Sequence, residues 1–284
     1  MVSSALLCLT LLLPTTDGAL PALDLGRAEA DLIVIASPKG FAGDRIPIQV
    51  HRTLKGSVDT TRIFVVQPRG YGLHVRLPAK ATPHLIFLKK TRSGWFPLQR
   101  PDILIPVPQG SRRERSVHAL FQLLARAAAI KHADQGKESL CSDLALFATS
   151  HVKADPLLAR AALLTLARRP DLAPSLPLDR RRSLTALLGD PASDARLRDL
   201  SARTLAAARQ PGLMAQLLTL MSQGKAQGLG PVFGRLLAAH EGPEPLDALA
   251  QAWKKAGPEA RTEIRRSLEA FVSPAARKLE ASLK

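Results

Sequence analysis

The spacing of apolar residues changes once along the chain, from the alternation typical of strands to the longer period typical of helices. In the first part, short runs rich in Ile and Val are separated by Gly and Pro, which favour turns. Ile46, Ile48 and Val50, for example, fall on one face of an extended segment. The predicted strands are residues 31–36, 45–52, 62–67, 73–77, 84–89 and 95–98. Five or six short strands predict a small closed or nearly closed β-barrel, because closure removes exposed strand edges.

The order of residues in this part resembles a known family of barrels. The matching motifs are Ala-Asp-Leu-Ile-Val-Ile at 30–35, Val-His-Arg-Thr-Leu-Lys-Gly at 50–56, His-Leu-Ile-Phe-Leu at 84–88 and Gly-Trp-Phe at 94–96. Over about residues 28–108 the chain looks like the netrin-module barrels of exported bacterial proteins. These are similar to the tissue inhibitors of metalloproteinases, whose barrel is of the oligonucleotide/oligosaccharide-binding (OB) type. The inhibitors chelate zinc through an N-terminal cysteine, and residues 19–30 contain none, so that activity is not inferred.

A stretch that begins at Asp155 returns at Asp194, and this recurrence predicts stacked helical repeats. At equal offsets from the two aspartates lie residues that would form the buried face of one helix. They are Leu158, Ala162, Thr165 and Leu166 in the first copy, and Leu197, Ser201, Thr204 and Leu205 in the second. Asp155 can cap the helix N-terminus, and Pro156 suits its first turn. Repeats of this kind bury their apolar faces only against their neighbours.

Weaker copies start at Gly230 and Gly257. The last three copies each have a helical partner upstream, at residues 184–188, 213–221 and 246–253. Over roughly residues 138–284 the pairs look like HEAT-type repeats, whose second helix reads Asp, then Val-Arg, then Ala and Leu on its inner face. The second copy fits this pattern, the first is shifted by one place, and the third has Gly234 where an arginine would stand. The resemblance implies a scaffold or binding surface and no particular reaction.

The predicted fold class is therefore α+β and multidomain, with a small five- to six-stranded OB-like barrel followed by an all-α HEAT-like solenoid. Prolines 101, 106 and 108 indicate a linker, because proline lacks a backbone donor and favours extended spacers. The expected divisions are a signal peptide at 1–19, a barrel at 28–100, a linker at 101–111 and a helical repeat domain at 112–284.

The N-terminal segment predicts export. Its apolar run at 5–13 is shorter than the about 20 residues that span a bilayer, and Gly18 and Ala19 suit signal cleavage. We therefore expect a mature chain in the periplasm, cell envelope or medium, with no transmembrane span. Residues 1–4 contain no Lys or Arg, however, so a cytoplasmic protein with a buried N-terminal strand or helix remains an alternative.

The chain is strongly basic, with a net charge of +16 from 40 Lys and Arg against 24 Asp and Glu. Such a charge attracts anionic polymers. The basic runs at 112–115 and 180–182 are too short for a nucleic-acid arm, which favours charge spread over solvated helix faces. After signal cleavage Cys141 would be the one remaining cysteine, which excludes an internal disulfide.

The sequence contains no recognisable catalytic motif. It has no P-loop, nucleophile elbow or dinucleotide fingerprint, and its seven histidines match no zinc-ligand spacing. The glycine-rich segment 224–230 lies between two predicted helices, so it is interpreted as a loop. We therefore predict a protein that is not an enzyme and has no catalytic, cofactor or metal site. An enzyme or enzyme inhibitor whose residues meet only in the fold stays open.

The leading prediction is an exported, non-enzymatic binding or scaffold protein of the bacterial cell envelope. It would act through the concave face of the repeats, the barrel surface or both, on a protein or an anionic polymer. The alternative is a cytoplasmic protein that binds nucleic acid. Aromatic residues on the barrel could stack on bases or sugars, although packing within a barrel is their commoner role. The candidate partner-binding residues are Trp95, Phe96, Arg160, Arg198, Arg203 and Arg235.

Overall fold

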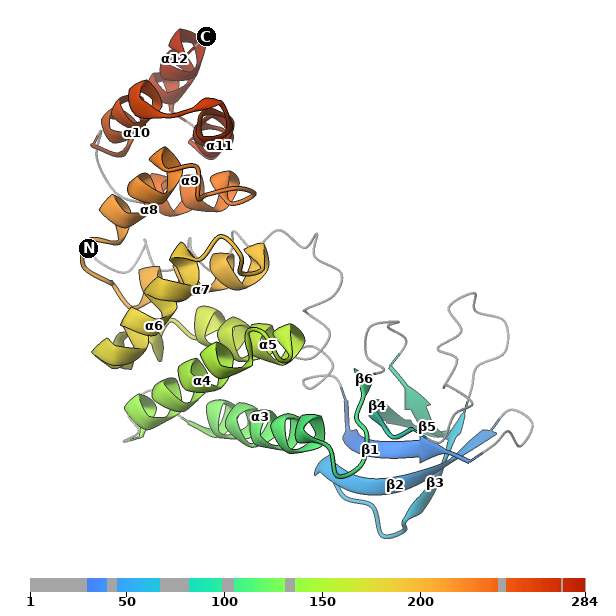
Figure 1. Cartoon of the computed structure of the whole chain (residues 1–284). Helices are drawn as coiled ribbons and strands as arrows, with labels where there is room; N and C mark the ends of the chain where they lie inside the picture. Colours follow the sequence, from blue (N-terminus) through green and yellow to red (C-terminus); the bar gives the residue numbers. More distant parts are fainter. Residues whose placement is uncertain are drawn as a thin grey trace. The chain divides into compact units, whose positions relative to one another are not determined.

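The computed structural model describes residues 30–39, 45–66, 82–98, 105–130, 136–239, 244–271 and 273–283. The chain divides into two compact units, Met1–Ala125 and Arg126–Lys284, and the division falls between two residues of helix α3. In the described residues the first unit contains six strands, and α3 to α12 make ten α-helices (Figure 1). The predicted signal peptide and the predicted strand at 73–77 lie outside the described residues.

Five strands of the first unit form a closed barrel. Their order is β1-β2-β3-β5-β4, and β4 pairs with β1 again. All neighbours are antiparallel except β3 and β5, which are parallel and pair through Val65 and Trp95. The strands are β1 (Leu32–Pro38), β2 (Arg45–Lys55), β3 (Arg62–Val66), β4 (His84–Thr91) and β5 (Gly94–Pro97). A mixed barrel followed by helices confirms the predicted α+β class.

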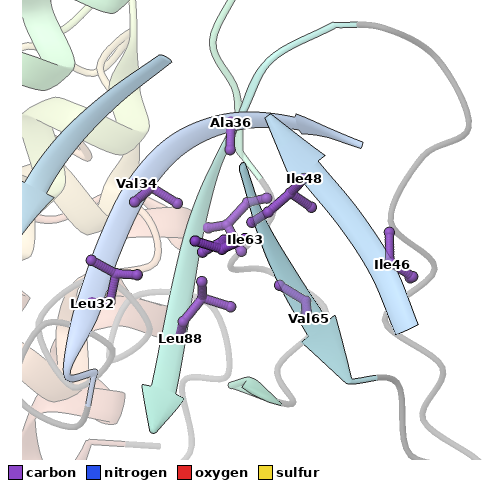
Figure 2. Packing of buried hydrophobic residues seen from close by; sticks show 9 residues of the cluster. Leu32, Val34, Ala36, Ile46, Ile48, Ile63, Val65 and Leu88 are labelled. Atoms are coloured by element: carbon purple, nitrogen blue, oxygen red, sulfur yellow. The ribbon is translucent and has the colours of Figure 1, made fainter. Parts of the chain in front are cut away.

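The barrel interior is filled by side chains from alternate positions of its strands (Figure 2). Ile46 and Ile48 are almost fully buried, and Val50 packs against the same cluster, so the alternation predicted for β2 is confirmed. The buried members are Leu32, Val34, Ala36, Ile46, Ile48, Ile63, Val65, Ile86 and Leu88. The alternation of side chains along the strands therefore fills the barrel interior with apolar groups.

Strand β1 is buried along its whole length, which explains its unbroken apolar run. Ile33, a residue of β1 outside the cluster in the barrel interior, pairs with Phe87 on β4. The ring of Phe87 lies 6.2 Å from that of Phe121, on α3 (Arg112–Ala129). Helix α3 therefore contacts β4 at Phe87, on the side of the strand that faces away from the barrel interior.

Part of the proline-rich segment belongs to the sheet. A short sixth strand, β6 (Ile105–Pro106), pairs with β4 outside the closed ring. The backbone N–H of Val107, a fully buried residue, then donates to the carbonyl of Pro83 at 2.7 Å. Over residues 105–107 the segment is therefore attached to the barrel and does not act as a free spacer.

The second unit consists of helices that pack in pairs and in two rows (Figure 1). One row contains α4, α6, α8 and α10, and the other contains α5, α7, α9 and α11, which contact one another in succession. Helices α6, α8 and α10 coincide with the predicted upstream partners. This arrangement is that of an α-solenoid in general. The bounds are α4 (Lys137–His151), α5 (Pro156–Arg168), α6 (Leu178–Gly189), α7 (Ala195–Ala207), α8 (Leu213–Ser222), α9 (Gly230–Ala238), α10 (Glu244–Lys255), α11 (Pro258–Leu268) and α12 (Pro274–Ser282), with a 3₁₀ turn, η2, at Ala173–Ser175.

The repeat predicted from the sequence coincides with the packing of α5 and α7. All eight residues at the matched offsets are buried. The carboxylate of Asp155 accepts a backbone N–H at the start of α5, as predicted, and that of Asp194 does the same at the start of α7. Thr165 and Thr204 also behave alike, since each hydroxyl donates to the carbonyl four residues earlier, at 2.9 and 2.8 Å. None of the described helices is long and apolar enough to cross a membrane.

The third repeat departs from the pattern because α9 and α11 approach closely. A Cβ atom on Gly230 would lie 2.5 Å from the carbonyl oxygen of Glu263, and one on Gly234 would overlap the carbonyl of Ser267. The two glycines and their two neighbours are each spaced by four residues, so one face of α9 meets one face of α11. Gly234 therefore replaces the expected arginine because no side chain fits there.

Replacing Gly234 with alanine should lower the free energy of unfolding of the helical unit by at least about 2 kcal/mol, because the backbones of α9 and α11 must separate. Gly189→Ala is the matched control, since that glycine ends α6 with its nearest neighbour 4.0 Å from an added Cβ. The control should change the stability by less than about 1 kcal/mol. Urea unfolding followed by circular dichroism measures both, and equal losses would contradict this packing.

Candidate functional site

The two candidate aromatic residues of the barrel lie side by side on β5. Trp95 is half-buried and packs against the barrel core, and the ammonium of Lys90 lies 5.7 Å from its ring centroid. Phe96 is also half-buried and pairs with Lys89 on β4. The indole therefore contacts the core and a lysine, which leaves a reduced area for stacking on a ligand.

Arg160 joins the first repeat to the second. Its Nη2 lies 2.5 Å from Oδ2 of Asp194, the residue that caps α7. The side chains of the two residues are 24% and 37% exposed, so solvent screens the pair and its contribution to stability is modest. The charge of Arg160 is thus largely compensated within the stack.

Arg198 is a structural residue, because the residue is only 2% exposed and its guanidinium is bound by backbone groups. Its Nε donates to the carbonyl of Leu188 at 2.9 Å, and its Nη2 donates to the carbonyl of Lys225. Burial lowers the pKa of Arg198, and the negative charge of Asp190 opposes that shift. The guanidinium therefore ties the end of α6 to the loop that precedes α9.

Arg203 and Arg235 form a cluster with one carboxylate, which we name the Arg203–Arg235 cluster. Nε of Arg203 lies 2.6 Å from Oδ1 of Asp199, whose side chain is 6% exposed. Arg235 lies on α9, next to α7. Burial lowers the pKa of Arg235, the positive charge of Arg203 lowers it further, and Asp199 opposes both. Arg203 is paired with Asp199, whereas Arg235 interacts with both groups only through their charges, so these three groups together carry a net positive charge.

Two features of the second unit were not predicted from the sequence. The buried carboxylate of Glu263 accepts the N–H of Gly230 at 2.8 Å and lies 3.0 Å from Nη1 of Arg266, so α11 caps the N-terminus of α9. A surface hollow lies between α10 and α11, lined by Trp253, Pro258, Arg261, Thr262 and Arg265. The spacing of the glycines at 230 and 234 and of the arginines at 261 and 265 was the available signal.

The groups that could act as nucleophiles or metal ligands are inaccessible or dispersed in the described part of the chain. Oγ of Ser37 lies 2.7 Å from Nε2 of His51, but Ser37 is only 2% exposed. Burial, assisted by the charge of Asp171, raises the pKa of the Cys141 thiol to about 11, and its Sγ donates to a backbone carbonyl. No three His, Cys, Asp or Glu side chains converge there as metal ligands.

Comparisons of the chain with protein-family models, with curated proteins and with solved structures find no match. The likeness to netrin-module barrels and to HEAT-type repeats is therefore one of sequence pattern. The barrel and the two-row helical stack are established by the coordinates independently of any relative.

Replacing Arg198 with alanine should cost about 2–4 kcal/mol of unfolding free energy, because the carbonyl groups of Leu188 and Lys225 lose the donor of a largely buried side chain. Arg160→Gln removes a charge from the neighbouring repeat and should cost about 1 kcal/mol or less, since its ion pair is partly solvated. Both values can be measured by urea unfolding of the full chain. A loss at Arg198 no larger than that at Arg160 would show that the buried guanidinium is not structural.

Proposed function

We propose that this chain is an exported, non-enzymatic binding or scaffold protein of the bacterial cell envelope. Its binding surface would be the exposed side of α5, α7, α9 and α11, which we name the second-helix face. The Arg203–Arg235 cluster is the observation that supports this proposal. A partly buried surplus of positive charge is costly in the free protein, and a partner that supplies a carboxylate or another anionic group relieves that cost.

The second-helix face is favoured over the barrel because other candidate residues already interact with groups of this chain. Trp95 packs on the barrel core, Arg160 is paired with Asp194, and Arg198 is bound to backbone carbonyls. Among the candidate arginines, Arg203 and Arg235 are the two whose positive charges are only partly compensated by other groups of the stack. The expected partner is a protein with acidic side chains or an anionic polymer of the envelope.

The architecture suits a scaffold in two further respects. In a HEAT-like stack the second helices line the concave side, which presents a long continuous surface to a partner. A netrin-like barrel would add a second binding module to the same chain. The resemblance to exported barrels and the apolar N-terminal segment both favour the envelope as the compartment.

A cytoplasmic nucleic-acid-binding protein is the second candidate, and the net charge of +16 favours it. Affinity for duplex DNA would then fall steeply as salt increases, because each phosphate contact releases a counterion. A partner recognised mainly by shape and a few charges would show a weaker dependence.

The export part of the proposal is tested on the native protein. We expect a mature N-terminus near Ala19 or Leu20 and recovery in the envelope fraction or the medium, because signal cleavage removes the apolar segment. N-terminal sequencing and cell fractionation measure both. An intact Met1 in the cytosol would exclude export and make the DNA titration the next experiment.

The binding part is tested by photo-crosslinking in cells. A photoreactive residue at Ala239, which is exposed one turn beyond Arg235, should give a discrete adduct. Combining it with Arg203→Gln and Arg235→Gln should remove most of the adduct, because the surplus charge is lost. The control position is Ala215, exposed on α8 in the other row. Equal adducts at both positions, or an adduct unaffected by the two substitutions, would contradict binding at the second-helix face.

A further inference from the structure

The hollow between α10 and α11 has the composition of a ligand site. It has a volume of about 230 Å³ and is lined by one aromatic ring, one proline, one hydroxyl and two guanidinium groups. The guanidinium carbons of Arg261 and Arg265 lie 5.4 and 5.7 Å from the ring centroid of Trp253. The indole therefore holds both cations at the wall of the hollow through cation–π attraction.

The two arginines are placed together at a cost. They are four residues apart on α11, where like charges repel and destabilise a helix. In the described part of the chain neither of them forms an ion pair with a carboxylate. Arg265 donates one hydrogen bond to the carbonyl of Leu283 at 3.0 Å, whereas the guanidinium of Arg261 has no hydrogen-bond acceptor among the described residues. Several N–H donors therefore remain available in the hollow.

The available groups define the class of ligand. Guanidinium groups bind carboxylates and phosphates through paired N–H donors, and stacking on an aromatic ring pre-orders them for this. Pro258 places one end of the hollow at the first turn of α11, where the helix dipole also favours negative charge. We infer that this hollow is a binding site for a small oxyanion with two or more negative charges, either a phosphorylated or a multiply carboxylated compound. The site is separate from the Arg203–Arg235 cluster and does not depend on the function proposed for it.

Calorimetric titration of the full chain with inorganic pyrophosphate, and separately with citrate, tests the site at constant ionic strength. Tighter binding of pyrophosphate would identify the phosphorylated source, and tighter binding of citrate the carboxylated one. A Trp95→Phe chain keeps Trp253 as its one tryptophan, so a change in fluorescence with the same midpoint would locate the ligand at the hollow. Absence of binding by both probes would overturn the inference.

Arg261→Gln should weaken binding at least about tenfold, because charge-assisted hydrogen bonds are lost. This variant should fold normally, since Arg261 makes no hydrogen bond or ion pair within the described residues. Arg277→Gln, at an exposed position of α12 that does not line the hollow, removes the same charge and should change affinity less than twofold. Equal weakening by the two variants would show general electrostatic attraction and would also overturn the inference.

Discussion

The structure of the second unit depends on one row of helices, α5, α7, α9 and α11, in which each helix is partly buried by the next helix of the row. Helices α5, α7, α9 and α11 contact one another in succession, and with 9 to 13 residues each is too short to be stable alone. The small or apolar residues at matched offsets are the consequence of that packing. Where the helices approach most closely, at α9 and α11, even a Cβ atom is excluded, and Gly230 and Gly234 are required.

The same stacking determines what the arginines of the second helices can do. A guanidinium group at a repeat boundary can reach a carboxylate or a carbonyl of the next repeat, as Arg160 does with Asp194 and Arg198 does with the carbonyl of Lys225. These residues therefore stabilise the stack, and their charge is not available to a partner. At the boundary between α7 and α9, Arg203 is paired with Asp199 and the charge of Arg235 is opposed by the same carboxylate, and this is the boundary where we propose that a partner binds.

Features that depend on local periodicity could be predicted from the sequence. The alternation in β2 and the eight buried positions of α5 and α7 follow from the strand and helix periods alone. The burial of Arg198 could not be predicted, because its acceptors are backbone carbonyls of Leu188 and Lys225, and every residue has such a group. The hollow at Trp253 depends on how two helices pack, which no single helical pattern specifies. The attachment of residues 105–107 to the barrel is likewise a tertiary contact that overrides a spacer-like composition.

The capping of α9 by Glu263 couples the unfolding of α11 to that of α9. Helix α9 has no side-chain cap of its own, so the charge at its N-terminus and the N–H of Gly230 are satisfied from α11. If α11 detached alone, a helix end and a glycine-lined face would both be exposed to water. The last two repeats should therefore behave as one cooperative unit in hydrogen exchange, whereas an ordinary solenoid can fray one repeat at a time from its end.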